Sequence, residues 1–187
     1  MTFRSYIPGF PGIFSFIHVY FSYYLPMEIL SGEQEVKAEQ WMYEAAKVAT
    51  QAKCLRALCG TVIVQWDQII GKGYNSPPLD CTPEHCAKKE RPAWFKSDAS
   101  CCVHSEQRAI DDALRHHSDK LQWATLYFTR VHEHGHILMA WKPFCTICSK
   151  AALDKWIAKF VLRHLEGITA YDTQEYNDLS FAYHGEE

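Results

Sequence analysis

The chain has 187 residues, 48% of them hydrophobic, which is enough for one substantial core and favours a single domain. The formal net charge of −3 provides no overall positive field for a polyanion, so we expect no obligate nucleic-acid partner. The eight cysteines do not form a scattered disulfide framework, because two are adjacent and two more form a C-x-x-C pair, and we expect a reducing, cytoplasmic location.

Residues 1–26 differ in composition from the rest of the chain. They contain a single arginine and many aromatic residues, lack the small-residue cleavage site of an export signal, and have no apolar run long enough to span a bilayer. We expect residues 1–30 to be a non-essential extension, residues 31–187 to form the functional domain, and no membrane partner. A peripheral membrane anchor built from aromatic side chains is the alternative for the first segment.

The first predicted element is a helix over residues 31–52, where a serine followed three residues later by a glutamine indicates a capping box. Two runs rich in β-branched residues, 60–66 and 68–75, have almost nothing between them and predict a β-hairpin. A loop rich in proline, cysteine and lysine occupies residues 76–100.

Helical spacing returns over residues 105–117 and again over residues 146–158. Strand composition is found in three further segments, which are residues 124–133, 136–141 and 159–165. The aromatic C-terminal tail has no pattern that assigns it to an element. Helices that alternate with strands in this way predict an α/β layered domain with a mixed sheet of about five strands.

Two short clusters can carry chemistry, and each lies at the start of a predicted helix. His104 and Glu106 form the first cluster, and Cys145 and Cys148 form the second. A helix N-terminus favours the thiolate, and two cysteines three residues apart can chelate one ion. One histidine and two thiolates make three zinc ligands, which leaves a fourth position for water or substrate. Glu106 is then close enough to move protons.

A histidine, any residue and a glutamate, followed later by a proline and a C-x-x-C pair, resemble the signature of the zinc-dependent deaminases. The chain resembles the cytidine deaminase superfamily and is closest to its deoxycytidylate branch. The segments CGTVIVQWDQIIGKGYNSPP and EQRAI resemble the corresponding family segments. This resemblance covers roughly residues 38–165 and implies a three-layer α-β-α domain, with residues 31–187 as the deaminase domain.

The resemblance also implies a role for each matching residue. Zinc, the only cofactor required, would be bound by His104, Cys145 and Cys148, with Glu106 as the proton carrier. Asn75 would hydrogen-bond the sugar, and the backbone N–H of Ser105 would reach the base carbonyl. The implied reaction is hydrolysis of the C–N bond of a cyclic amidine, most simply dCMP to dUMP with release of ammonia. Members of the family usually form homo-oligomers.

Three features depart from the family pattern. Ser105 stands where alanine is usual, although the signature leaves this residue free. Phe144 separates the proline from the first cysteine, which it ordinarily precedes directly. Residues 130–142 intervene between a predicted strand and the cysteine pair. In this feature the chain resembles the nucleoside-type cytidine deaminases more closely, but those enzymes have a cysteine at the position of His104. An insertion beside the pocket can change the substrate.

Several alternatives stay open. The substrate can instead be a free nucleoside, a purine base or a polynucleotide. The protein can also be a non-catalytic structural zinc module, in which Cys101 or Cys102 closes the metal site as a fourth ligand. Basic residues that flank the expected pocket could bind a nucleotide phosphate or be solvated surface charges, and they are Lys72, Lys88, Lys89, Arg91, Arg108, Arg130 and Lys142.

The remaining cysteines allow a second, structural zinc, because the segments around Cys54 and Cys81 resemble those that supply such a site in some phage-type deoxycytidylate deaminases. That second site would use Cys54 and Cys81 together with Cys86 or His85 and with Cys101. Small buried side chains are the alternative for these cysteines.

Overall fold

The computed structural model describes residues 27–86 and 100–183, so the segment 1–26 and part of the 76–100 loop lie outside the described residues. Within them, seven strands form one mixed sheet in the order β1-β7-β6-β4-β2-β3, and β5 pairs with the end of β4. Only β4 and β6 pair in parallel among these described strands. The strands are β1 (Glu28–Ile29), β2 (Leu58–Gln65), β3 (Gln68–Tyr74), β4 (Thr125–Val131), β5 (Ile137–Leu138), β6 (Lys159–His164) and β7 (Gly167–Asp172).

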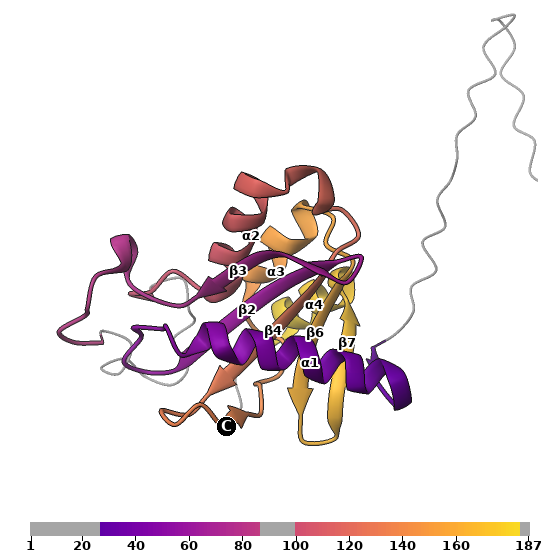
Figure 1. Ribbon diagram of the computed structural model, residues 1–187, viewed down its shortest axis with the longest axis horizontal. Helices are drawn as coiled ribbons and strands as arrows, with labels where there is room; N and C mark the ends of the chain where they lie inside the picture. The colour runs from indigo at the N-terminus through magenta and orange to yellow at the C-terminus, as the bar shows by residue number, and fades with distance from the viewer. Residues whose placement is uncertain (1–26, 87–99, 184–187) are drawn as a thin grey trace, which may run out of the picture.

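Helices cover both faces of this sheet (Figure 1). Helix α1 (Gly32–Ala49) lies on one face, and α2 (Ser105–His116), α3 (Thr146–Asp154) and α4 (Thr173–Ala182) lie on the other. The alternation of side chains along β2 explains why both faces are covered, because Val62 and Val64 pack with α1 while Ile63 packs with α2 and α3. The expected three-layer α-β-α domain with a mixed sheet is confirmed.

The expected number of about five strands was wrong, because β1 and β7 were not recognised. β7 follows β6 after a turn of two residues, Leu165 and Glu166, which lack the Asn-Gly type of hairpin signal. β1 has only two residues and forms by pairing with β7, so no local pattern marks it. The Leu30 N–H also donates to Ile168 O at 2.8 Å, which ties the end of segment 1–30 to the sheet. That residues 1–30 are non-essential stays a prediction.

The other elements agree with the sequence pattern, mostly with earlier ends. The predicted hairpin is β2 and β3, joined through Trp66 and Asp67, whose positive φ angles of 48° and 59° suit a tight two-residue turn. The Ser31 side chain makes no capping hydrogen bond to α1, so the predicted capping box is not formed. The unassigned C-terminal tail forms α4, and the Asp172 carboxylate caps it by accepting from the Gln174 N–H at 2.9 Å.

Glycines allow the helices to approach the sheet closely. A Cβ atom on Gly73 of β3 would overlap the carbonyl oxygen of Ser105 and the amide nitrogen of Ala109, both in α2. On the other face, a Cβ atom on Gly60 would overlap the carbonyl oxygen of Ala45 in α1. The contact of Gly73 with Ser105 sets the distance between the sheet and the first turn of α2.

We expect Gly73→Ala to lower the free energy of unfolding by about 3 kcal/mol, because the added methyl group must push α2 away from β3. Urea unfolding followed by circular dichroism measures the change. The control is Lys72→Ala on the same strand, whose side chain is exposed, and which should change stability by less than about 0.5 kcal/mol. Equal midpoints for the two variants would contradict this close packing.

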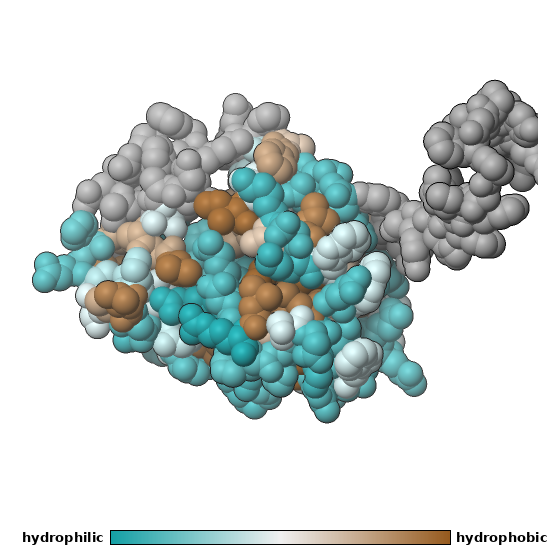
Figure 2. Space-filling model, turned by 90° about the horizontal axis from the view of Figure 1, so that it is seen from above, coloured by the Kyte–Doolittle hydropathy of each residue, from teal (hydrophilic) through white to brown (hydrophobic). Residues whose placement is uncertain are grey.

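The face of the molecule seen in Figure 2 is largely hydrophilic, with hydrophobic side chains gathered in separate patches. Among the described residues, Trp123 and Trp156 are exposed by 61% and 64%, with ring centroids 6.3 Å apart. In the described parts of the chain we find no helix with the length and apolar character needed to cross a membrane.

Candidate active site

The three predicted metal ligands meet between the N-termini of α2 and α3. His104 directly precedes α2, Cys145 directly precedes α3, and Cys148 lies in the first turn of α3. α3 belongs to the crossover from β4 to β6, so the cluster lies near the carboxyl ends of two parallel strands. In open α/β sheets, ligands commonly bind at this end of such strands.

The side chains of this cluster point toward one another. His104 Nδ1 lies 3.2 Å from Cys148 Sγ and 3.4 Å from Cys145 Sγ. All three candidate ligand atoms lie within 4.8 Å of one another. A tetrahedral zinc with two sulfur ligands and one nitrogen ligand separates these atoms by roughly 3.5 to 3.8 Å. The cluster therefore fits zinc after a small outward movement of the ligand atoms.

The two thiols are prepared unequally for metal binding. The hydrogen bond from Cys148 lowers the pKa of Cys145 to about 4, and His104 adds to the effect. The same shared hydrogen bond, together with burial, raises the pKa of Cys148 well above its ordinary value. Cys145 is thus ready as a thiolate, and Cys148 must release its proton when a metal binds.

The second ring nitrogen of His104 contacts Ser100, with Nε2 and Oγ 3.2 Å apart. The Ser100 hydroxyl donates its proton to Cys102 O at 2.8 Å, so its oxygen can accept the Nε2 proton. This arrangement favours the tautomer that carries its proton on Nε2 and directs the Nδ1 lone pair at the two cysteines. No pattern in the sequence indicates this contact of Ser100.

We expect Ser100→Ala to weaken zinc binding about 10-fold, because His104 loses the partner that fixes its tautomer and ring orientation. Competition with a chromophoric chelator measures the dissociation constant. Ser118→Ala, at an exposed serine beyond α2, is the matched control and should leave the constant unchanged. Equal affinities for both variants would show that Ser100 has no influence on the ligand.

Glu106 lies in the first turn of α2, and only 6% of its surface is exposed. Burial raises the pKa of its carboxyl group, although the nearby charge of His104 acts in the opposite direction. Its Oε2 accepts a hydrogen bond of 2.9 Å from Ser105 Oγ. A carboxyl group with a raised pKa is suited to take up and release a proton near neutral pH.

The two predicted substrate-binding residues have different surroundings. The backbone N–H of Ser105 lies at the first position of α2, where a helix leaves N–H groups without intrahelical acceptors. Asn75 uses its side chain to hold β2, because Oδ1 accepts from Cys59 N at 2.9 Å and Nδ2 donates to Ala57 O at 2.8 Å. One Nδ2 proton remains for a further acceptor, so a contact of Asn75 with a sugar stays a prediction.

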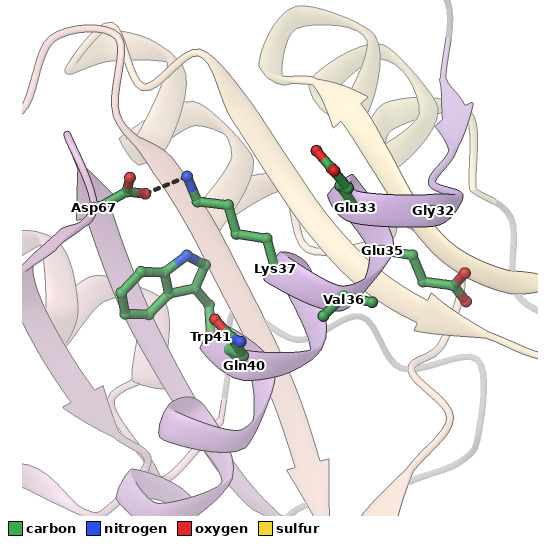
Figure 3. A pocket seen from close by; sticks show the side chains of 8 residues that line it. All are labelled: Gly32, Glu33, Glu35, Val36, Lys37, Gln40, Trp41 and Asp67. Atoms are coloured by element: carbon green, nitrogen blue, oxygen red, sulfur yellow. Dashed lines mark ion pairs between the residues drawn. The ribbon is translucent and has the colours of Figure 1, made fainter.

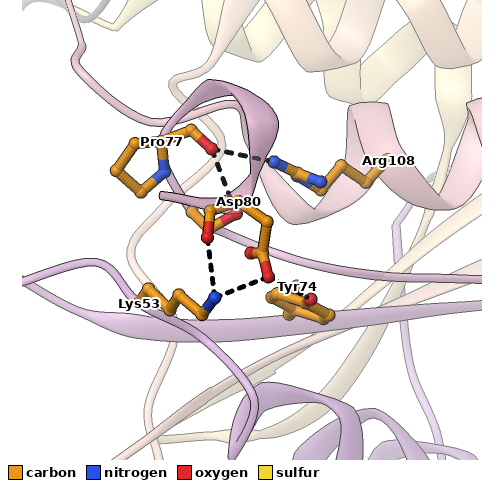
Figure 4. Close-up of polar contacts among 6 residues, drawn as sticks. Lys53, Tyr74, Pro77, Asp80 and Arg108 are labelled. Atoms are coloured by element: carbon orange, nitrogen blue, oxygen red, sulfur yellow. Dashed lines mark hydrogen bonds and ion pairs between the residues drawn. The ribbon is translucent and has the colours of Figure 1, made fainter. Parts of the chain in front are cut away.

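The segment that follows Asn75 is held in place by the polar contacts shown in Figure 4. Lys53 Nζ pairs with Asp80 Oδ2 at 2.7 Å, and Tyr74 donates to the same carboxylate at 3.1 Å. The Lys53 bond is the largest of the effects that lower the pKa of Asp80 to about 2. Arg108, one of the predicted phosphate-binding residues, donates to Pro77 O at 3.0 Å and thereby joins this segment to α2.

Aromatic side chains and one arginine flank the first cysteine. The Arg130 guanidinium lies 3.5 Å from the ring centroid of Trp141, and the Trp141 ring meets Phe144 edge to face at 5.8 Å. Phe144 also contacts Tyr183, with centroids 5.8 Å apart. The inserted residues 130–142 thus end in a group of packed aromatic side chains directly before Cys145 in the chain. In β4, Arg130 pairs with Cys59 of β2, two residues along the strand from Thr61.

The cysteines predicted for a second zinc are only partly brought together. Cys101 donates to Cys86 with the sulfurs 4.0 Å apart. Burial raises the pKa of the Cys102 thiol, and the neighbouring Cys54 and Cys101 add to the effect. Cys81 is exposed. Within residues 27–86 and 100–183, the only group of three or more candidate ligand side chains within 4.8 Å is the His104, Cys145 and Cys148 cluster. The second zinc therefore stays a prediction.

A separate groove lies on the α1 side of the sheet, away from the metal cluster (Figure 3). It is lined by Val36 and Trp41 and crossed by the ion pair of Lys37 with Asp67. The groove contains none of the residues predicted for catalysis or metal binding.

Comparisons with known proteins give one matching family model and several similar solved structures. The family model described as the cytidine and deoxycytidylate deaminase zinc-binding region matches residues 35–163. The dCMP deaminase from the cyanophage S-TIM5, in complex with dCMP and dUMP, has 20% identity and a TM-score of 0.47, with 70% of this chain and 82% of that chain covered. The apo form of that enzyme has 18% identity and a TM-score of 0.46, with coverage of 67% and 80%.

A third solved structure is the diaminohydroxyphosphoribosylaminopyrimidine deaminase/5-amino-6-(5-phosphoribosylamino)uracil reductase from Thermotoga maritima. Its identity to this chain is 19% and its TM-score 0.39, with 67% of this chain and 29% of that chain covered. No curated protein sequence matches the chain.

Proposed function

The chain belongs to the cytidine and deoxycytidylate deaminase family, and from this premise we propose that it is a zinc-dependent enzyme that hydrolyses dCMP to dUMP and ammonia. The observation that carries the proposal is the cluster of His104, Cys145 and Cys148 with the buried carboxyl group of Glu106 beside it. Three protein ligands leave a fourth position for water, which is the arrangement of catalytic zinc sites. A structural site would use a fourth protein ligand instead.

The proposed reaction replaces the amino group on C4 of cytosine by oxygen from water. His104, Cys145 and Cys148 would hold zinc, which would supply the Lewis acidity that makes water nucleophilic near neutral pH. Glu106 takes a proton from the attacking water and passes it to ring N3, and it then carries the second proton of that water to the leaving nitrogen, which departs as ammonia. The Ser105 N–H holds the base carbonyl, and Asn75 holds the sugar.

Two features support a nucleotide as the substrate. His104 as the first ligand resembles the deoxycytidylate branch, because the nucleoside-type enzymes have a cysteine at this position. Arg130, which is half-buried against Trp141, has no ion pair with a carboxylate among the described residues. A guanidinium in this situation suits a phosphate. Because the insertion that ends near Trp141 and Phe144 departs from the family pattern, other substrates are tested as well.

We expect a cytoplasmic homo-oligomer without a membrane partner and without an obligate nucleic-acid partner. The net charge of −3 and the eight cysteines support these expectations. The catalytic cluster requires one zinc per chain, and the cysteines near Cys101 would add a second.

A substrate panel tests the proposed function. Ammonia release is measured with dCMP, CMP, deoxycytidine, cytidine, adenine, guanine and single-stranded DNA, and dCMP should give the highest kcat/KM. A higher value for a nucleoside or a purine base would replace dCMP as the substrate, and activity on DNA with steep salt dependence would identify a polynucleotide enzyme. A zinc module without catalysis would release no ammonia, and its cobalt-substituted form would show four protein ligands.

A further inference from the structure

Two buried hydroxyl groups connect the sheet to the carboxyl group of Glu106. Thr61 of β2 donates from Oγ1 to Ser105 Oγ at 2.9 Å, and Ser105 donates from Oγ to Glu106 Oε2 at 2.9 Å. Thr61 and Ser105 are both 0% exposed, so water does not compete for these bonds. The connection joins residues 44 positions apart in the sequence.

The direction of these bonds follows from the number of protons. Each hydroxyl group has one proton to donate. Thr61 gives its proton to Ser105, and Ser105 can therefore accept from Thr61 while it donates its own proton to Glu106. Glu106 Oε2 is thus held as an acceptor, and Oε1 is left for proton transfer.

We propose that Thr61 and Ser105 are positioning residues that fix the orientation of the Glu106 carboxylate from the rigid sheet. This inference rests on the proposed role of Glu106 in deamination. A glutamate side chain has several rotatable bonds, and small displacements of a reacting group reduce rates strongly. Because the Gly73 contact with Ser105 fixes the first turn of α2 against the sheet, the hydroxyl chain has a stable base.

The inference also gives a role to a departure from the family pattern. An alanine, which is usual at position 105 in the family, has no hydroxyl group and cannot make either bond. In this chain, Ser105 connects Glu106 to Thr61, whereas the sequence alone suggested that only the backbone N–H of Ser105 mattered.

The test compares Ser105→Ala, Thr61→Val and the double variant with the parent enzyme. Ser105→Ala should lower kcat about 10-fold and change KM less than twofold, with the zinc content unchanged. Thr61→Val should have a smaller effect that disappears in the Ser105→Ala background, because Thr61 acts through Ser105. Thr61→Ser keeps the hydroxyl group and should restore kcat.

The matched control is Thr129→Val on the neighbouring strand β4. Thr129 is also 0% exposed, and its hydroxyl donates to Met42 O of α1 at 3.2 Å on the other face of the sheet. This variant loses a buried hydrogen bond of similar kind, so it should lose stability as Thr61→Val does but keep kcat. Equal kcat values for Thr61→Val, Ser105→Ala and Thr129→Val would overturn the inference.

Crystal structures of the parent and of Ser105→Ala provide a readout that is independent of activity. The carboxylate of Glu106 should rotate away from its position in the parent when the serine hydroxyl is removed. If the parent released no ammonia from any substrate, the proposed function would fail while this rotation still supported the positioning role. An unmoved carboxylate in Ser105→Ala would overturn the positioning role whatever the activity of the parent.

Discussion

Glu106→Gln should reduce kcat by a factor of about 10² to 10⁴, because glutamine cannot carry a proton from the attacking water to the leaving nitrogen. The zinc content should stay at the parent level, since Glu106 is not among the three clustered ligands. The glutamine side chain has the same shape, and its carbonyl oxygen can accept the hydrogen bond from Ser105. Steady-state ammonia release and metal analysis of the same preparation measure both effects.

The stability of this variant separates a chemical effect from a structural one. Burial raises the pKa of the Glu106 carboxyl group, so the buried charge contributes no stability that glutamine would lose. We expect a Tm equal to or above that of the parent. Glu33→Gln, at an exposed residue of α1, should keep both kcat and Tm. A Glu106→Gln enzyme with more than about a tenth of the parent's kcat would exclude Glu106 as the proton carrier.

The parts of the fold that the sequence predicted are those with a repeated local pattern. The β2–β3 hairpin was predicted because two β-branched runs stand almost side by side, and α2 was predicted because its apolar residues recur at helical spacing. β1 could not be predicted in the same way, since its two residues become a strand only when they pair with β7. Pairing over such a distance leaves no periodic signal in a short segment.

In the site, too, features with a local sequence pattern could be predicted and features that depend on packing could not. The placement of His104, Glu106, Cys145 and Cys148 at two helix N-termini was predictable, because short spacings at the start of helical patterns mark it, while their roles stay predictions. The role of Ser105 as a contact of Glu106 was not, because the direction of its side chain depends on the packing of α2 against β2. Contacts that depend on tertiary packing require the structure.

The order of the chain around the site separates the inserted residues from the predicted metal ligands. Cys145 directly precedes α3 and Cys148 lies in its first turn, while the residues before them follow the paired strands β4 and β5. Trp141 and Phe144 lie in this preceding segment with their rings edge to face, so a change there leaves the spacing of the two cysteines unaltered.

Cys148→Ala should remove the catalytic zinc almost completely. Cys148 is 0% exposed, and its sulfur lies 3.2 Å from His104 Nδ1, so the loss of this sulfur leaves only His104 and Cys145 to hold the ion. Two ligands bind zinc far more weakly than three. Zinc per chain, measured by inductively coupled plasma mass spectrometry, should fall by one, and ammonia release should fall to background.

The variant should also unfold at a lower temperature than the zinc-loaded parent, because a ligand that binds only the folded state stabilises it by about 4 kcal/mol when present at a thousand times its dissociation constant. Cys59→Ala is the matched control, since it removes the same atom from a buried cysteine whose pKa is raised by burial, and it should keep its zinc.

The absolute zinc count of the parent and the variant tests the second site at the same time. A parent with two zincs per chain and a Cys148→Ala variant with one would place the second ion elsewhere, and Cys101→Ala should then remove it. An unchanged zinc count in Cys148→Ala would contradict the assignment of Cys148 as a ligand.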